Sequence, residues 1–135
     1  MNKPYLYLIC LSFFAFLFIT GCDKEKSKNQ DEQELELLFT KIKSLAESSS
    51  CDNETYQLKF IAIGSKGCGG PTGYLGYSTS INVNEFESLV AKYTSFQADY
   101  NRKWNIMSTC EAILPPSSVQ CENGKPVLVY ENYNK

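Results

Sequence analysis

The stretch NVNEFESLVAKYTSFQADYNRKW, residues 82–104, decides the fold of this chain. Asn82 stands three residues before Glu85, a spacing typical of a helix start, where a polar side chain caps the first turn. Apolar residues then recur at intervals of three and four, namely Phe86, Leu89, Val90, Tyr93, Phe96, Tyr100 and Trp104. This periodicity predicts an amphipathic helix over about 84–104, with its apolar stripe in the core.

A second amphipathic helix is expected N-terminal to the first, over about 31–47. Its apolar positions have the same spacing and are Leu35, Leu38, Phe39, Ile42, Leu45 and Ala46. Acidic residues near the start and lysines further along suit the helix dipole. The run Ser48-Ser49-Ser50 is expected to end the helix.

The remaining regular structure is predicted to be short strands. Residues 55–63 alternate and then become continuously apolar, and 74–79 form a second extended segment. Asn123-Gly124 between 119–122 and 126–130 is a strong hairpin signal, and Pro126 indicates an edge strand because proline lacks a backbone donor. The fold class is therefore α+β: two amphipathic helices packed on a small antiparallel sheet, stabilised by disulfides.

The N-terminus has the pattern of an export signal. Met1-Asn2-Lys3 precedes an apolar run over 5–19, which closes with Ile19-Thr20-Gly21-Cys22. Small residues directly before a cysteine predict a lipoprotein signal peptide over 1–21 and lipidation of Cys22. A transmembrane anchor is the alternative, but a spanning helix needs about 20 apolar residues. The prediction is a protein anchored by lipid to the outer membrane, on its periplasmic face or at the cell surface.

The segment after Cys22 is polar and charged. Residues 22–34 are expected to be the lipidated cysteine and a flexible tether, since residues 23–34 contain no apolar side chain to bury. Residues 35–135 are expected to form a single small domain, because a chain of this size rarely divides into two cores.

Four cysteines are left after the leader and Cys22 are set aside: Cys51, Cys68, Cys110 and Cys121. An even number in an exported chain predicts disulfides. Three pairings are possible, and nearest-neighbour pairing would give Cys51–Cys68 and Cys110–Cys121. A zinc site is the less favoured alternative, since there is no histidine and the cysteines are not in close pairs.

Composition argues against several functional classes. Without Lys3 of the leader there are 12 basic and 15 acidic residues, a balance unlike that of nucleic-acid-binding proteins. Asp99, Glu111 and Glu122 are candidate acid–base groups, but they have no motif. We therefore expect no enzyme, no metal and no cofactor.

The loop GSKGCGGP, residues 64–71, is the most distinctive feature of the chain. Its glycines and Lys66 suggest an anion site, but the Gly-Lys-Ser/Thr ending of a P-loop is absent. The favoured interpretation is a tight turn around a disulfide at Cys68. Lys66, Tyr74 and Tyr77 are the candidate binding residues, because tyrosine gives contact area with few rotamers. Sheet packing is the alternative role of these tyrosines.

Several motifs together resemble a known family. They are Ala62-Ile63-Gly64-Ser65-Lys66, Cys68-Gly69-Gly70-Pro71 with Tyr74, then Tyr100-Asn101, Ser108, Cys110 and 121–126. Over about 51–130 the chain resembles a family of small, functionally uncharacterised lipoproteins of Bacteroidota, with a GSKxCGGPxxY motif. The family often has an acidic residue directly before the third cysteine, where this chain has Thr109. The resemblance implies location and disulfides, but no reaction.

The expected function is therefore that of a membrane-anchored binding module for a protein or glycan ligand, and inhibition of a hydrolase is one form that such binding could take. A rigid loop loses little entropy when it docks, which favours loop 64–74 as the contact. A passive structural component of the envelope is the alternative, and a histidine-free enzyme is the least favoured.

Overall fold

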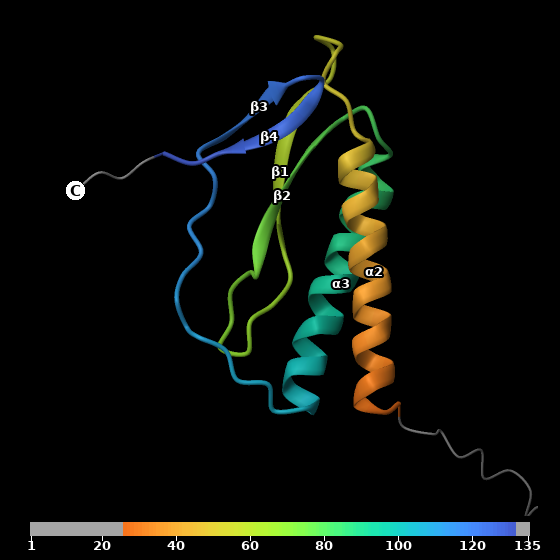
Figure 1. The fold of residues 1–135 in the computed structure, drawn as a ribbon, viewed down its shortest axis with the longest axis vertical. Coiled ribbons are helices and arrows are strands. Elements are labelled where there is room, and N and C mark those ends of the chain that lie inside the picture. The colour runs from red at the N-terminus through yellow and green to blue at the C-terminus, as the bar shows by residue number, and fades with distance from the viewer. Residues whose placement is uncertain (1–25, 132–135) are drawn as a thin grey trace, which may run out of the picture.

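The computed structural model describes residues 26–131, and these residues form two helices and two β-hairpins (Figure 1). The elements, in chain order, are α2 (Lys28–Ser48), β1 (Leu58–Ile63), β2 (Gly73–Ser78), α3 (Val83–Lys103), β3 (Ser118–Glu122) and β4 (Lys125–Val129). The predicted signal peptide and the predicted lipidation site, Cys22, lie outside the described residues. Within 26–131 no helix has the length and apolarity needed to cross a membrane. The α+β prediction is confirmed.

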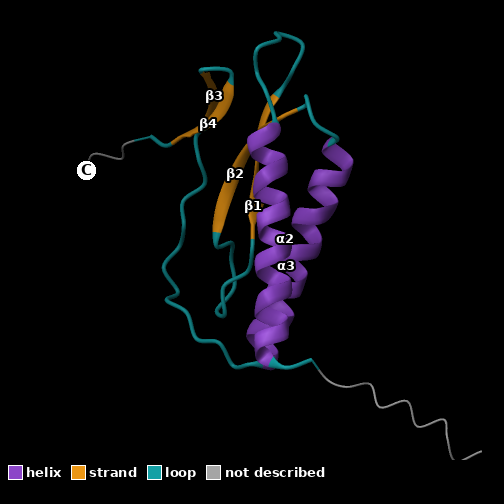
Figure 2. Cartoon of the chain, turned by 45° about the vertical axis from the view of Figure 1, so that its right-hand side comes forward, coloured by secondary structure: helices purple, strands orange, loops and turns teal. Residues whose placement is uncertain are grey.

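Helices α2 and α3 run antiparallel along one side of the molecule, with the β1–β2 hairpin beside them (Figure 2). The core between these layers is formed by the predicted stripes. Ile42 of α2 and Phe86 of α3 are both 0% exposed, and Ile63 of β1 and Tyr77 of β2 complete the cluster.

Helix α2 begins earlier than the sequence suggests. The Ser27 hydroxyl accepts from the backbone N–H of Gln30, whose side chain accepts from the N–H of Ser27, so a capping box starts the helix. Asp31 in the first turn is buried against the end of α3. The tether prediction is therefore wrong for 28–34, because polar residues there are held by capping and by a buried ion pair. The C-terminus at Ser49 agrees with prediction.

Helix α3 agrees with its predicted bounds. The Asn82 side chain accepts from the Glu85 backbone N–H at 3.3 Å, as the capping signal indicated. The helix ends where the Trp104 N–H reaches the carbonyl of Tyr100, and Asn105 then takes a positive φ of 50°.

The strands form two separate two-stranded sheets, and not the one small sheet that was expected. In β1–β2, Ile61 is opposite Leu75 and Ile63 is opposite Gly73. In β3–β4, Asn123 and Gly124 make the predicted two-residue turn, both with positive φ. The two hairpins pack against each other through side chains, since Gly76 of β2 lies under Leu128 of β4.

A disulfide joins the second hairpin to the end of α2. Cys51 and Cys121 are bonded, with a sequence separation of 70. The N–H of Cys51 also donates to the carbonyl of Gly124 at 3.1 Å. Nearest-neighbour pairing is therefore wrong: the packing of the hairpin on α2 places Cys121 beside Cys51, while Cys68 and Cys110 lie elsewhere as free thiols.

Candidate functional site

The loop between β1 and β2 is the candidate site, and its first residue needs to be glycine. Gly64 has φ +79°, and a Cβ there would lie 2.0 Å from Oγ1 of Thr72. Its N–H donates to Oγ1 of Thr94 on α3 at 3.0 Å. A residue with a Cβ would clash with Thr72 and would be strained at this φ, so the turn out of β1 requires glycine at position 64.

Side chains from outside the loop hold its backbone in place. Gln97 of α3 accepts from the N–H of Ser65 at 2.8 Å, and Asn101 of α3 donates to the carbonyl of Ser65 at 2.7 Å. Ser108 accepts from the N–H of Gly67 at 3.0 Å. The loop is thus fixed to α3 and to the segment 105–117, which we call the connecting segment.

The tip of the loop, residues 67–70, is exposed yet internally ordered. The N–H of Lys66 donates to the carbonyl of Gly70 at 2.9 Å, and the N–H of Gly69 donates to the carbonyl of Lys66 at 3.0 Å. Because these donors and those of Ser65 and Gly67 are already used within the protein, they are unavailable to cradle a phosphate. The geometry favours a tight turn over an anion site.

A cavity of about 510 Å³ with a mixed polar and apolar lining lies between this loop and the end of α3, and its lining includes Lys66, Asn101, Arg102 and Met107. The Lys66 ammonium donates to the backbone carbonyl of Glu111, while Arg102 pairs with Asp99. The charge of Arg102 is therefore balanced within the chain, whereas Lys66 keeps its positive charge and is only held in place by the carbonyl.

The two candidate tyrosines differ in their exposure to solvent. Tyr77 is only 2% exposed, and its hydroxyl donates to Glu87. Burial is the main cause that raises the pKa of Tyr77 far above its ordinary value. Tyr77 therefore packs in the core and cannot take part in a surface contact, which corrects its place among the binding residues.

Tyr74 remains at the surface together with an aromatic residue that the sequence did not single out. The ring of Tyr74 lies edge-on to Phe60, with a centroid separation of 6.0 Å, and Phe60 is 40% exposed. Strand alternation explains the pair, since Ile61 and Ile63 face the helices and Phe60 faces outward. The alternation over 58–63 was the available signal for Phe60.

Cys68 and Cys110 meet where the loop contacts the connecting segment. Both are exposed and free. The Cys68 sulfur lies 3.7 Å from both the Ser108 hydroxyl and the Thr109 carbonyl. The hydrogen bond from Cys110 is the main cause that lowers the pKa of the Cys68 thiol, and the same bond raises the pKa of Cys110.

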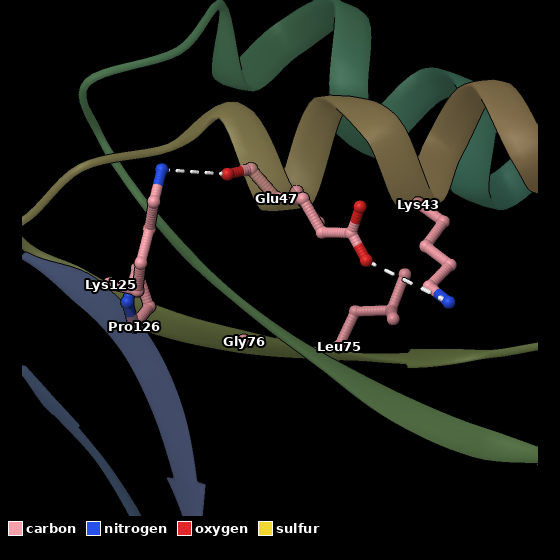
Figure 3. Close-up of a pocket in the computed structure, with 7 residues that line it drawn as sticks. Lys43, Glu47, Leu75, Gly76, Lys125 and Pro126 are labelled. Atoms are coloured by element: carbon pink, nitrogen blue, oxygen red, sulfur yellow. Dashed lines mark hydrogen bonds and ion pairs between the residues drawn. The ribbon is translucent and has the colours of Figure 1, made fainter. Parts of the chain in front are cut away.

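A second pocket, of about 290 Å³, lies between α2 and the two hairpins (Figure 3). Leu75, Ala46 and Pro126 give it apolar walls. Lys43 is 3.7 Å from the Glu47 carboxylate, and Lys125 donates to the Glu47 carbonyl at 2.9 Å. Both lysines therefore interact with the C-terminal part of α2: Glu47 balances the charge of Lys43, and the ammonium of Lys125 is hydrogen-bonded to a helix carbonyl.

The three candidate carboxylates are exposed and lie on different elements. Asp99 is on α3, Glu111 is in the connecting segment and Glu122 is on β3. Among the described residues, no group of three or more acidic, cysteine or histidine side chains is arranged to hold a metal ion.

Fold and site together define an α+β protein of two antiparallel helices and two hairpins, with a disulfide at one end and an ordered, exposed glycine loop near the other. Comparison with known proteins finds no matching protein family, no matching curated protein and no matching solved structure.

Proposed function

We propose that this protein is an exported lipoprotein, anchored by Cys22 to the outer membrane, that binds a protein partner through a surface beside the glycine loop. We call this the loop surface and define it as Lys66, the tip 67–70, and the Phe60–Tyr74 pair. The observation that carries the proposal is that the loop backbone is fixed by hydrogen bonds while its tip and Phe60 stay exposed.

The rigid loop supports a docking role on energetic grounds. A flexible loop would lose conformational entropy on association, at a cost of about 1 kcal/mol or more per ordered residue. Here Thr94, Gln97, Asn101 and Ser108 have already ordered the backbone. Little of the favourable binding free energy would therefore be offset by the entropy cost of ordering the loop.

The chemistry of the loop surface favours a protein partner. Two partly exposed aromatic rings give an apolar centre, as tyrosine-rich interfaces commonly do. Lys66 at its side adds a positive charge, which suits an acidic residue on the partner. A glycan would be expected to need several free polar side chains beside the rings, and the polar groups of the loop are mostly used internally.

The anchor is supported by the sequence of the leader and by the resemblance to Bacteroidota lipoproteins. Intact mass of the membrane-extracted protein, compared with a Cys22→Ala variant, tests it. Acyl chains on the wild type and their absence from the variant are expected. An unmodified Cys22 would overturn the anchor and leave the binding proposal standing.

The loop surface is tested by photo-crosslinking in cells that produce the protein. A benzophenone amino acid replaces Tyr74 and, as the matched control, Tyr56, a 37% exposed tyrosine outside this surface. One discrete protein adduct is expected from position 74 only. Lys66→Glu should weaken it about tenfold, whereas Lys92→Glu, which changes an exposed lysine of α3, should not.

The outcomes separate the proposal from its alternative. A passive envelope component predicts no discrete adduct at position 74, or adducts of equal strength at both positions. Either result would overturn the loop surface as a binding site. An adduct unaffected by Lys66→Glu would remove Lys66 from it.

A further inference from the structure

The two free thiols of the described residues lie side by side at the surface. Cys68 is at the tip of the loop and Cys110 is in the connecting segment, 42 residues later by their numbering. The two segments meet below the β1–β2 hairpin (Figure 1), where Gly67 donates its N–H to Ser108. The Cys68 sulfur lies 3.7 Å from the Ser108 hydroxyl and from the carbonyl of Thr109, the residue directly before Cys110.

The surroundings of the pair make the two sulfurs unequal. The Ser108 hydroxyl and the Thr109 carbonyl are each 3.7 Å from the Cys68 sulfur, and Cys110 and the positive charge of Lys66 also act on it. These groups lower the pKa of Cys68, chiefly through Cys110, while Cys110 holds its proton more tightly. Cys68 is thus suited to attack and Cys110 to follow.

The fold does not need a bond between these two sulfurs. Hydrogen bonds with Gln97, Asn101 and Ser108 hold the loop while both thiols are free. Cys51–Cys121 already links the end of α2 to the second hairpin, at the other end of the molecule. A bond at Cys68 can therefore form and break while the core stays packed.

We propose that Cys68 and Cys110 form a thiol–disulfide exchange site that acts on disulfides of other exported proteins. The Cys68 thiolate attacks one sulfur of a partner disulfide, forms a mixed disulfide and releases the other partner sulfur as a thiolate. Cys110 then gives its proton to the partner thiolate released in the first step and attacks the Cys68 sulfur, which releases the second partner sulfur as a thiolate. The partner disulfide is reduced by two electrons, and the pair is oxidised to a Cys68–Cys110 disulfide.

This site goes beyond the proposed function and does not depend on it. Exchange is reversible, so the oxidised pair can equally pass its disulfide to two partner thiols. Exposure of both sulfurs gives a partner access, which a buried structural disulfide would deny.

Glutathione disulfide is the probe for the first step, used on the full chain extracted from membranes. Cys110→Ser should trap a glutathione adduct on Cys68, located by peptide mass mapping. The reciprocal Cys68→Ser should form its adduct on Cys110 at least about tenfold more slowly near neutral pH. Equal rates would overturn the assignment of Cys68 as the attacking sulfur.

Ser108→Ala tests the environment of Cys68, because loss of the Ser108 hydroxyl should raise the pKa of the Cys68 thiol and shift the pH at which it reacts. The alkylation rate of Cys68 against pH should shift to higher pH in this variant, with near-ultraviolet circular dichroism still native and the melting temperature slightly lower because the Gly67 N–H loses its acceptor. The titratable groups that act on Cys68 are Cys110 and Lys66. An unshifted profile would remove Ser108 from the site.

Graded glutathione buffers, followed by alkylation and mass measurement, separate exchange from a structural bond. The Cys68–Cys110 pair should change between oxidised and reduced while Cys51–Cys121 stays oxidised and near-ultraviolet circular dichroism stays native. Loss of the native signal together with reduction of Cys68–Cys110, or a pair that never oxidises, would overturn the proposal.

Discussion

Asp31 is the residue whose burial most constrains this fold. Its carboxylate accepts from the Lys103 ammonium and from the Trp104 indole N–H, each at 3.0 Å. Trp104 is the main cause that lowers the pKa of Asp31, and Lys103 adds to it. The start of α2 is thereby attached to the end of α3.

Asp31→Asn should lower the melting temperature by roughly 5–10 °C, because the neutral amide replaces the charged carboxylate that accepts hydrogen bonds from Lys103 and Trp104. Asp99→Asn is the matched control, since the Asp99–Arg102 pair is exposed and should contribute little. Thermal unfolding by circular dichroism checks both. Equal shifts in the two variants would contradict the role of Asp31.

The same ion pair predicts a pH dependence. The folded-state pKa of Asp31 lies below its ordinary value of 3.8, so its contribution to stability is present above that pH. It is lost as pH falls through the folded pKa. The melting temperatures of wild type and Asp31→Asn should therefore converge in acid. A difference that stays constant from about pH 7 to about pH 2 would contradict the ion pair.

Gly67 is a second residue that the packing constrains, because the loop and the connecting segment meet closely at this position. A Cβ at Gly67 would lie 2.3 Å from the backbone oxygen of Ile106, whereas one at Gly73 would meet nothing within 4 Å. Gly67→Ala should lower the free energy of unfolding by about 1–3 kcal/mol, because the new methyl group would push the loop away from the connecting segment. Gly73→Ala should change stability by less than about 0.5 kcal/mol. Urea unfolding measures the difference, and similar losses would contradict the close contact.

At the level of elements, the β3–β4 hairpin depends on the end of α2. Its turn is encoded locally by Asn123-Gly124, but a lone two-stranded hairpin is marginal in water. Lys125 donates to the carbonyls of Glu47 and Ser49, and Cys121 is bonded to Cys51. The hairpin is therefore stable because of where it is attached.

Replacing both Cys51 and Cys121 with serine should lower the free energy of unfolding by about 4 kcal/mol, from the chain entropy of a loop of this length. The comparison is best made with Cys68 and Cys110 also replaced, so that one disulfide alone varies. Urea unfolding with and without the pair gives the number. A loss under about 1 kcal/mol would contradict the entropic role of this bond.

For the whole molecule, the anchor predicts an orientation. Cys22 precedes Ser27 by five residues, at most about 18 Å of extended chain. Helix α2 has 21 residues and is about 31 Å long, with the β3–β4 hairpin beyond its C-terminal end (Figure 1). The start of α2 should therefore lie near the lipid surface and the hairpin should point away from it.

A photo-crosslinking residue at Lys28 should give lipid adducts several-fold more often than one at Asn123, in vesicles that hold the lipidated protein. Cys22→Ala should abolish both, because the chain is then released. Equal labelling at the two positions would show that the domain turns freely on its anchor.

The local elements were predictable from the sequence because local features encode them. The stripe of Phe86, Val90 and Tyr93 predicted α3, and Asn123-Gly124 predicted the second hairpin. The glycine loop that contains Lys66 was recognisable from its own composition for the same reason, and its role in binding stays a prediction. The start of α2 was missed although Ser27 and Gln30 give a local capping-box signal. Only the contact of Asp31 with Trp104, which spans 73 residues, has no local signal.

What the sequence alone determined is therefore the class of the fold, the bounds of α3, the turns and the glycine loop, since periodicity, capping and backbone conformation act over a few residues. The tertiary structure decided the cysteine pairing, the division into two sheets, and the burial of Tyr77 beside the exposure of Phe60. Those features depend on which surfaces meet when the helices and hairpins pack, and contacts between residues far apart in the chain have no local signal.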